Sequence, residues 1–216
     1  MQSKGVFTYN ADINKTAYMN WRMDAHSAEH NLAEMGNGFF LAAECLLQNA
    51  LDNNRDKRAD VLVFPILYSI DQGIEVYLKA IICLIELIAS GESNNYTTHN
   101  ILQLFREMKS LIKKKEKTTK GLDKHLNSLS EYINELVNVA ADKKGNPKMD
   151  FARYPFDTDG TPHFYVSFTN TPVDMECMLM RAREIKESLD SLYTMYSVEL
   201  DQLMEQKAVT QDNCEY

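Results

Sequence analysis

The sequence lacks any uncharged hydrophobic run of the roughly 20 residues that a membrane-spanning helix needs. Its longest apolar stretch, Val61 to Ser90, is interrupted by charges at Asp71, Glu75, Lys79 and Glu86. The first residues, MQSKGVFTYNADINK, contain no apolar core of a secretory signal peptide. We therefore expect a globular, cytoplasmic chain with no membrane partner.

Paired cysteines and the common nucleotide and hydrolase motifs are also missing. Cys45, Cys83, Cys177 and Cys214 form no CxxC pair, and the first three fall among apolar residues of expected helices, which predicts buried structural thiols. There is no GxxxxGK[ST], GxGxxG or GxSxG sequence. His26 and His30 share a helical face, but no further ligand follows at a suitable spacing, so we expect no metal and no cofactor.

Charge is present but unevenly distributed. The net charge of -8 argues against a surface that binds nucleic acid everywhere. Between Arg106 and Lys148, however, 11 basic residues face 6 acidic ones, a local charge of +5. This segment contains the run Lys113, Lys114, Lys115 and Lys117. The run is interpreted either as a solvated helix end, where cations favour the helix dipole, or as a patch for RNA or an acidic partner.

Apolar residues recur every three or four positions in five segments, which is typical of amphipathic helices. The expected helices are 27–53, 61–90, one that follows a capping Thr98, 122–140, and one that starts near Thr171. Pro65 is expected in the first turn of the second helix. Gly36 and Gly38 predict a kink in the first helix or a close approach of another backbone.

The segment 143–171 differs in kind, because it collects glycines, prolines and aromatic residues. It predicts an ordered aromatic loop or a small β-hairpin that pairs 151–154 with 164–168. Residues 1–26 form an N-terminal arm over the body or at a dimer contact, and 207–216 a frayed tail. The expected fold is all-α: an up-down bundle of about five helices over 27–206, with the insertion before the last helix.

A polar brace is expected on the second helix. Glu75 precedes Lys79 by four residues, the favourable order for a helical ion pair. His99 opens the next helix and is expected to cap or orient it, with a bond to Glu75 or to the neighbours of Lys79. These three residues predict a polar groove between the two helices.

The stretch IDQGIEVYLKAIICLI, followed after a short loop by HNILQLF, resembles the central helices of HEPN domains of bacteria and archaea. The similarity covers roughly residues 27–140. It implies a four- or five-helix bundle that forms homodimers. Many members are metal-independent RNases of toxin-antitoxin and phage-defence systems, and others are non-catalytic partners of effector proteins. The resemblance therefore implies a homodimer with a protein effector encoded nearby, and possible contact with RNA.

The ribonuclease signature of that family, an Arg followed by a His after four to six intervening residues, is absent. The leading expectation is therefore a non-catalytic binding or regulatory component. Two alternatives stay open: a structural scaffold, and an endoribonuclease with a displaced site. Such a site would use Arg153 to hold phosphate and Tyr154, His163 or His99 to move protons. The competing interpretation is that Arg153 pairs with a nearby acid and that the aromatic residues cover the end of the bundle.

Overall fold

The computed structural model describes residues 5–94, 96–118, 120–140, 145, 147, 149–166 and 170–212. Its elements are η1 (Ile13–Lys15), α1 (Ala28–Asp52), α2 (Ala59–Ser90), α3 (Ile101–Glu116), α4 (Leu122–His125), α5 (Asn127–Ala140), η2 (Met149–Ala152), η3 (Phe164–Val166) and α6 (Met175–Asp212). The described residues contain no strand. The all-α bundle is thus confirmed.

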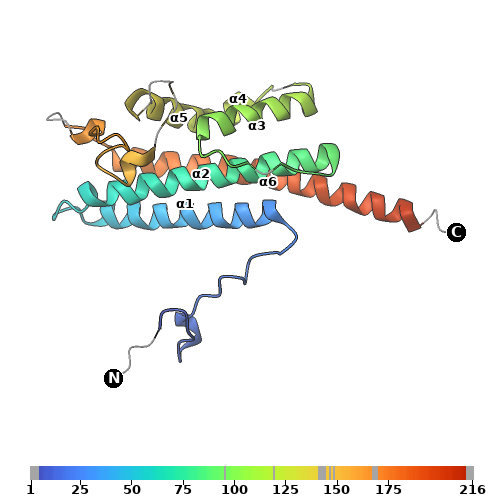
Figure 1. Ribbon diagram of the computed structural model, residues 1–216, viewed down its shortest axis with the longest axis horizontal. Helices are drawn as coiled ribbons and strands as arrows, with labels where there is room; N and C mark the ends of the chain where they lie inside the picture. The colour runs from blue at the N-terminus through green and yellow to red at the C-terminus, as the bar shows by residue number, and fades with distance from the viewer. Residues whose placement is uncertain are drawn as a thin grey trace.

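The long helices α1, α2 and α6 lie side by side, and α3, α4 and α5 form a second layer along them (Figure 1). The helix α2 is the centre of the bundle, because it contacts α1, α3, α6 and η2. The C-terminal end of α6 extends past the other helices (Figure 1). No described helix is long and apolar enough to cross a bilayer.

Two glycines let α1 and α2 approach each other closely. A Cβ atom on Gly36 of α1 would lie 2.5 Å from Tyr77 Cδ2, and one on Gly73 of α2 would lie 2.8 Å from Phe40 Cδ2. The Gly36 carbonyl oxygen would lie 3.4 Å from the Cβ atom on Gly73, so the predicted close approach of another backbone is confirmed at Gly36. A Cβ atom on Gly38 would meet nothing within 4 Å, so Gly38 has no such role.

The termini of three helices differ from the sequence expectations. Pro65 lies in the second turn of α2, because the helix already begins at Ala59. The N-cap of α3 is Asn100, whose side chain accepts from the Gln103 N–H at 3.1 Å, whereas Thr98 caps only Asn100 itself. The last helix begins after Asp174, whose carboxylate accepts from two backbone N–H groups of the first turn.

The expected helix 122–140 is interrupted at Leu126, which separates α4 from α5. Its backbone leaves the helical region there, with φ -98° and ψ 15°, and its side chain is fully buried. The apolar spacing continues through this break, since both pieces pack on the same core. Spacing alone therefore could not reveal the interruption.

The prediction of a β-hairpin between 151–154 and 164–168 is wrong for the residues that the structure describes. Ser167 and Phe168 lie outside the described residues. The segment forms the two 3-10 helices η2 and η3, with one isolated bridge between Phe156 and Pro162. Its aromatic rings pack on each other and on α2. The ring centroids of Phe151 and Phe164 lie 5.1 Å apart, and those of Phe64 of α2 and Tyr165 are separated by the same distance. Burial of the rings, rather than strand pairing, orders the loop.

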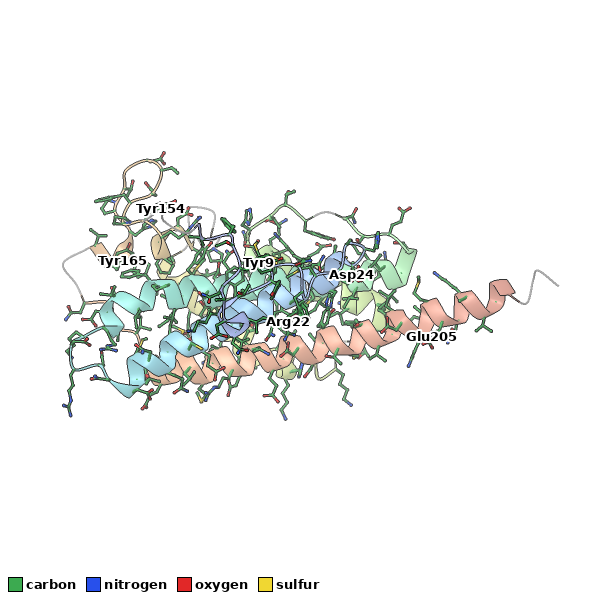
Figure 2. All side chains as sticks on the ribbon, turned by 90° about the horizontal axis from the view of Figure 1, so that it is seen from below. Tyr9, Arg22, Asp24, Tyr154, Tyr165 and Glu205 are labelled. Carbon is green, nitrogen blue, oxygen red and sulfur yellow. The ribbon has the colours of Figure 1, made fainter. Side chains whose placement is uncertain are left out.

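The N-terminal arm extends away from the helical bundle (Figure 1). It is tied to α1 at its end, where the Asn31 side chain bonds to Asp24 and His30 Nε2 lies 2.9 Å from the Arg22 carbonyl. Beyond this anchor the arm keeps large apolar side chains in solvent, including Phe7, which is 94% exposed. At the other end of the chain, α6 continues to Asp212 with Glu205 on its projecting part (Figure 2), and residues 213–216 lie outside the described residues.

Candidate functional site

A polar pocket of about 420 Å³ lies between α2, the start of α3 and η2. It is lined by Tyr68, Asp71, Gln72, Glu75, His99, Asn100, Pro147, Met149, Asp150 and Arg153. The residues come from three separate elements, so the pocket exists only because the aromatic insertion folds back onto α2. We call this hollow the polar pocket.

The carboxylate of Glu75 is the fixed centre of the pocket. It is buried, and its Oε1 atom accepts from Lys79 Nζ at 2.8 Å and lies 2.9 Å from His99 Nδ1. In the tautomer that donates from Nδ1 to this carboxylate, the unprotonated ring nitrogen is Nε2. The His99 side chain is 82% exposed, which leaves Nε2 accessible. The expected polar brace is therefore formed as one hydrogen-bonded group.

Asp71 lies one turn before Glu75 and is almost completely buried, at 1% exposure. Its Oδ1 atom has no hydrogen-bond partner. Burial raises the pKa of Asp71 well above its usual range, the charge of Glu75 raises it further, and Arg153 opposes both effects. The shift favours the protonated form of Asp71 relative to an exposed carboxyl.

Arg153 closes the other side of the pocket from the insertion. Its guanidinium binds the Asp150 carboxylate at 2.7 Å and packs over the rings of Tyr68 and Tyr154 at 5.7 and 5.5 Å. The bond to Asp150 raises the pKa of Arg153 above its ordinary value. The pairing of Arg153 with Asp150 matches the alternative interpretation of the sequence, in which Arg153 binds a nearby acid instead of a phosphate.

The proposed set of Arg153, Tyr154, His163 and His99 is only partly brought together. Arg153 and His99 line the polar pocket, and Tyr154 lies beside Arg153 with 57% of its surface exposed. His163 does not line the pocket. Its ring stacks on Tyr165 at 6.3 Å, and its Nε2 atom is buried without a partner.

Asp71 is one of the pocket residues that sequence reasoning missed, and it is almost completely buried. The signal was its spacing: Asp71 stands four positions before Glu75 and so lies on the same face of α2. An acid in an otherwise apolar helix four residues from another acid is rarely left in the core without a role. The pair could have been recognised on that ground.

The lysine run lies at the C-terminal end of α3. Lys115 binds Glu199 of α6 at 2.7 Å and packs over the ring of Tyr196, whereas Lys113, Lys114 and Lys117 are exposed. One of the four cations thus joins the basic end of α3 to the acidic α6. The other three remain on the surface.

The cysteines do not all behave as expected. Cys83 is buried, but Cys45 and Cys177 are exposed, because each lies on the solvent side of its helix. Cys214 lies outside the described residues. Within the described part of the chain, no group of three or more His, Cys, Asp or Glu side chains is arranged to hold a metal ion.

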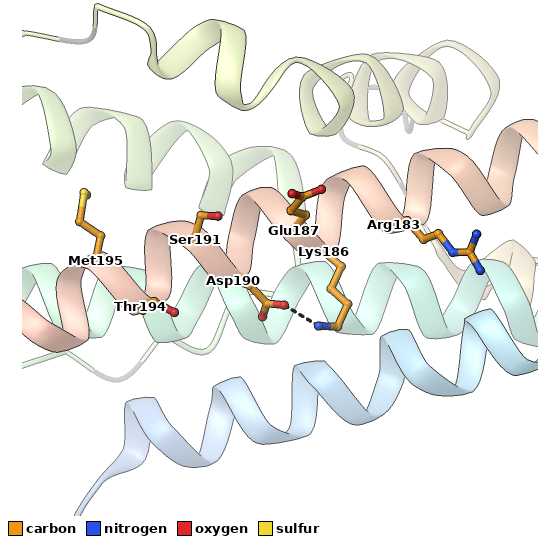
Figure 3. A pocket seen from close by; sticks show the side chains of 7 residues that line it. All are labelled: Arg183, Lys186, Glu187, Asp190, Ser191, Thr194 and Met195. Atoms are coloured by element: carbon orange, nitrogen blue, oxygen red, sulfur yellow. Dashed lines mark hydrogen bonds and ion pairs between the residues drawn. The ribbon is translucent and has the colours of Figure 1, made fainter.

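Another hollow runs along α6 and is lined by Arg183, Lys186, Glu187, Asp190, Ser191, Thr194 and Met195 (Figure 3). Three of its four charged residues, Arg183, Lys186 and Asp190, already have partners. Asp190 binds Lys186 and accepts from the Tyr77 hydroxyl, and Arg183 binds Glu44 of α1. The contacts with Tyr77 and Glu44 tie α6 to α2 and α1.

Comparison with known proteins adds no further assignment. No family model, curated protein or solved structure matches this chain. Functional conclusions therefore depend on the geometry of the chain itself.

Proposed function

We propose that this chain is a HEPN-like, non-catalytic binding and regulatory component of a bacterial defence or toxin-antitoxin system, acting in the cytoplasm. The observation that supports it is the bonded group of Glu75, Lys79 and His99. The resemblance depends on the segments that contain these residues, and those two segments are joined at this point. The group stabilises one edge of an open polar pocket, which is the recognition site in this proposal.

A binding role is favoured over catalysis because the cationic side chains at the polar pocket are already paired with carboxylates. Arg153 is paired with Asp150, and Lys79 with Glu75. Cleavage of a phosphodiester without metal needs a cation that is free to meet the developing charge of the transition state. A pocket whose charges are balanced in pairs instead suits the polar surface of a protein, and a protein effector encoded nearby is the proposed partner.

One observation favours a second candidate, a metal-independent endoribonuclease. The accessible Nε2 atom of His99 and the guanidinium of Arg153 line the same pocket as the carboxyl of Asp71, whose raised pKa favours its protonated form. A base, a cation and an acid are the groups that attack by a ribose 2′-hydroxyl requires. In this scheme Arg153 must exchange Asp150 for the phosphate.

Cleavage of RNA in EDTA separates these candidates. The binding proposal predicts no cleavage of tRNA or mRNA by the wild-type protein. Cleavage that falls at least tenfold in both His99→Ala and Arg153→Ala would establish the nuclease instead. The same assay with Lys113→Ala and Lys114→Ala reports whether the exposed part of the lysine run contributes to RNA contact.

Co-purification tests the binding proposal directly. The protein products of adjacent genes are co-expressed with the tagged chain, and we expect one of them to be retained. Gln72→Arg adds a charge inside the polar pocket and is expected to reduce retention at least tenfold. Gln202→Arg makes the same change on an exposed face of α6 and is the matched control. Equal retention by both variants would remove the polar pocket from the proposal.

Homodimer formation is part of the same proposal. Its support is the arm, where Phe7, Met19 and Trp21 are at least 80% exposed, because side chains of this size are seldom left in solvent together on a monomer. Light scattering at micromolar concentration is expected to give twice the chain mass. Phe7→Ser with Trp21→Ser is expected to give a single chain mass. A wild-type protein of single chain mass would contradict the dimer.

A further inference from the structure

A second hollow, here called the apolar cavity, lies on the side of the aromatic insertion away from the polar pocket. It has a volume of about 300 Å³ and is enclosed by α2, α5, the insertion and the first turns of α6. Its wall includes Val63, Phe64, Leu136, Phe151 and Tyr165. This size and this lining are typical of sites for small organic molecules.

The aromatic side of the cavity is held in place before any ligand arrives. The Tyr165 hydroxyl donates to the carbonyls of Phe151 and Tyr154 at 2.9 and 3.0 Å, which fixes its ring. Phe164 meets Tyr165 edge to face at 5.6 Å. A rigid wall of this kind lowers the entropic cost of binding, because few side chains need to be ordered.

The wall contains one unsatisfied polar group. Tyr132 of α5 lines the cavity with 4% of its surface exposed, and its hydroxyl has no hydrogen-bond partner. Burial raises the pKa of Tyr132 well above its ordinary value. The hydroxyl therefore keeps its proton. It is a buried donor without an acceptor, a state that native proteins seldom leave unfilled.

The charged residues at the cavity are already bound by the protein. Arg181 donates to Glu131 and to the Ser128 carbonyl, and Asp174 accepts from the first turn of α6. Glu135 also lies 3.9 Å from Arg181, so the cation at the cavity is shared by two carboxylates and is not free to pair with an anionic head group. These contacts favour an uncharged ligand.

We propose that the apolar cavity binds a small, uncharged, largely apolar molecule that presents one hydrogen-bond acceptor to the Tyr132 hydroxyl. An aryl ketone has this chemistry. The site is independent of the polar pocket and of the function proposed for it, since none of the residues that line one hollow lines the other.

The test compares two probes of nearly the same shape with the full-length protein. The probe 2-acetylnaphthalene carries a carbonyl acceptor, and 2-ethylnaphthalene carries none. Binding is followed by methyl NMR, where shifts are expected at Val63 and Leu136 and not at Leu41, which is on the outer face of α1. The ketone is expected to bind about fivefold more tightly, the effect of one neutral hydrogen bond. In Tyr132→Phe the two affinities are expected to become equal.

Filling the cavity provides the second readout. Val63→Phe is expected to weaken both probes more than tenfold. Val61→Phe is the matched control, because Val61 lies on the same helix but is 70% exposed and does not line the cavity. Val139→Trp, at the half-exposed rim, replaces Val63→Phe if circular dichroism shows that the latter does not fold.

Three results would overturn the proposal. The first is that neither probe binds the wild-type protein, which would point to a side chain of a partner protein as the occupant. The second is equal binding by the filled and control variants. The third is a preference for the ketone that persists in Tyr132→Phe.

Discussion

The polar pocket and the apolar cavity lie on opposite sides of the same short 3-10 turn. Asp150 at the start of η2, and Arg153 just after it, line the polar pocket, whereas Phe151 between them lines the apolar cavity. In the polar pocket the charges are paired and one carboxyl oxygen is not, at Asp71; in the apolar cavity the charges are also paired and one hydroxyl is not, at Tyr132. In each hollow, residues whose polar groups have partners, here called frame residues, thus surround a single polar group without a hydrogen-bond partner.

This comparison separates residues that hold the frame from residues that are left available to a ligand. Glu75 should be costly to remove, since its partner Lys79 is largely buried with it. The unsatisfied residues should be costly to keep, since each is desolvated without compensation. The predictions below are ordered from the largest expected effect on stability to the smallest.

Glu75→Ala is expected to have the largest effect, a loss of about 3 kcal/mol in the free energy of unfolding measured with urea. The variant leaves the Lys79 ammonium with 12% of its side chain exposed and without its counter-ion. Adding Lys79→Met removes that cation and is expected to restore most of the loss, because an apolar pair often replaces a buried ion pair without cost. If the double variant is as unstable as Glu75→Ala, the ion pair does not hold the frame.

Asp71→Asn is expected to stabilise the protein at neutral pH by about 2 kcal/mol, because it removes a buried carboxyl that resists ionisation. The folded-state pKa of Asp71 is raised. Its stabilising contribution is therefore complete below the unfolded pKa of about 3.9 and is lost as pH rises through the folded pKa. The difference between Asp71→Asn and the wild type should consequently be small near pH 4 and should grow with pH.

The control for this pH dependence is Asp60→Asn, which makes the same change at an exposed position in the first turn of α2. Its difference from the wild type is expected to stay nearly constant over the same pH range. A wild-type protein that is more stable than Asp71→Asn at pH 8 would mean that the ionised carboxylate is stabilised, contrary to the burial and the unpartnered oxygen.

The two hollows also differ in how far the sequence could predict them. The spacing of Glu75 and Lys79 was sufficient to predict their ion pair in the polar pocket, since side chains four residues apart on a helix are neighbours on its surface. The contact of His99 with Glu75 was one of two alternatives expected from the sequence, the other being a contact with the neighbours of Lys79. Asp71 was missed although its spacing from Glu75 carried the same signal.

The apolar cavity could not be predicted, because it is enclosed by four segments that are far apart in the sequence. Alternating aromatic residues in the insertion suggested strands, but an isolated pair of short strands is marginal without a sheet to join. Phe151 and Tyr165 instead pack against α2. Tyr132 stands three positions after Leu129 and four before Leu136, so its burial could have been inferred, but not the absence of a partner for its hydroxyl.

Tyr132→Phe is expected to have the smallest effect, a gain of about 1 kcal/mol in the free energy of unfolding. The substitution removes an oxygen that is buried without a partner and keeps the ring that fills the core. Tyr77→Phe is the matched comparison, because the Tyr77 hydroxyl donates to Asp190 of α6 and so joins two central helices. That variant is expected to lose about 1 to 2 kcal/mol, which is typical of a hydrogen bond to a charged group. Equal losses in both variants would show that the Tyr132 hydroxyl has a hydrogen-bond partner in solution. The apolar cavity would then have no unsatisfied group to offer a ligand, whereas the conclusion about Glu75 in the polar pocket would be unaffected.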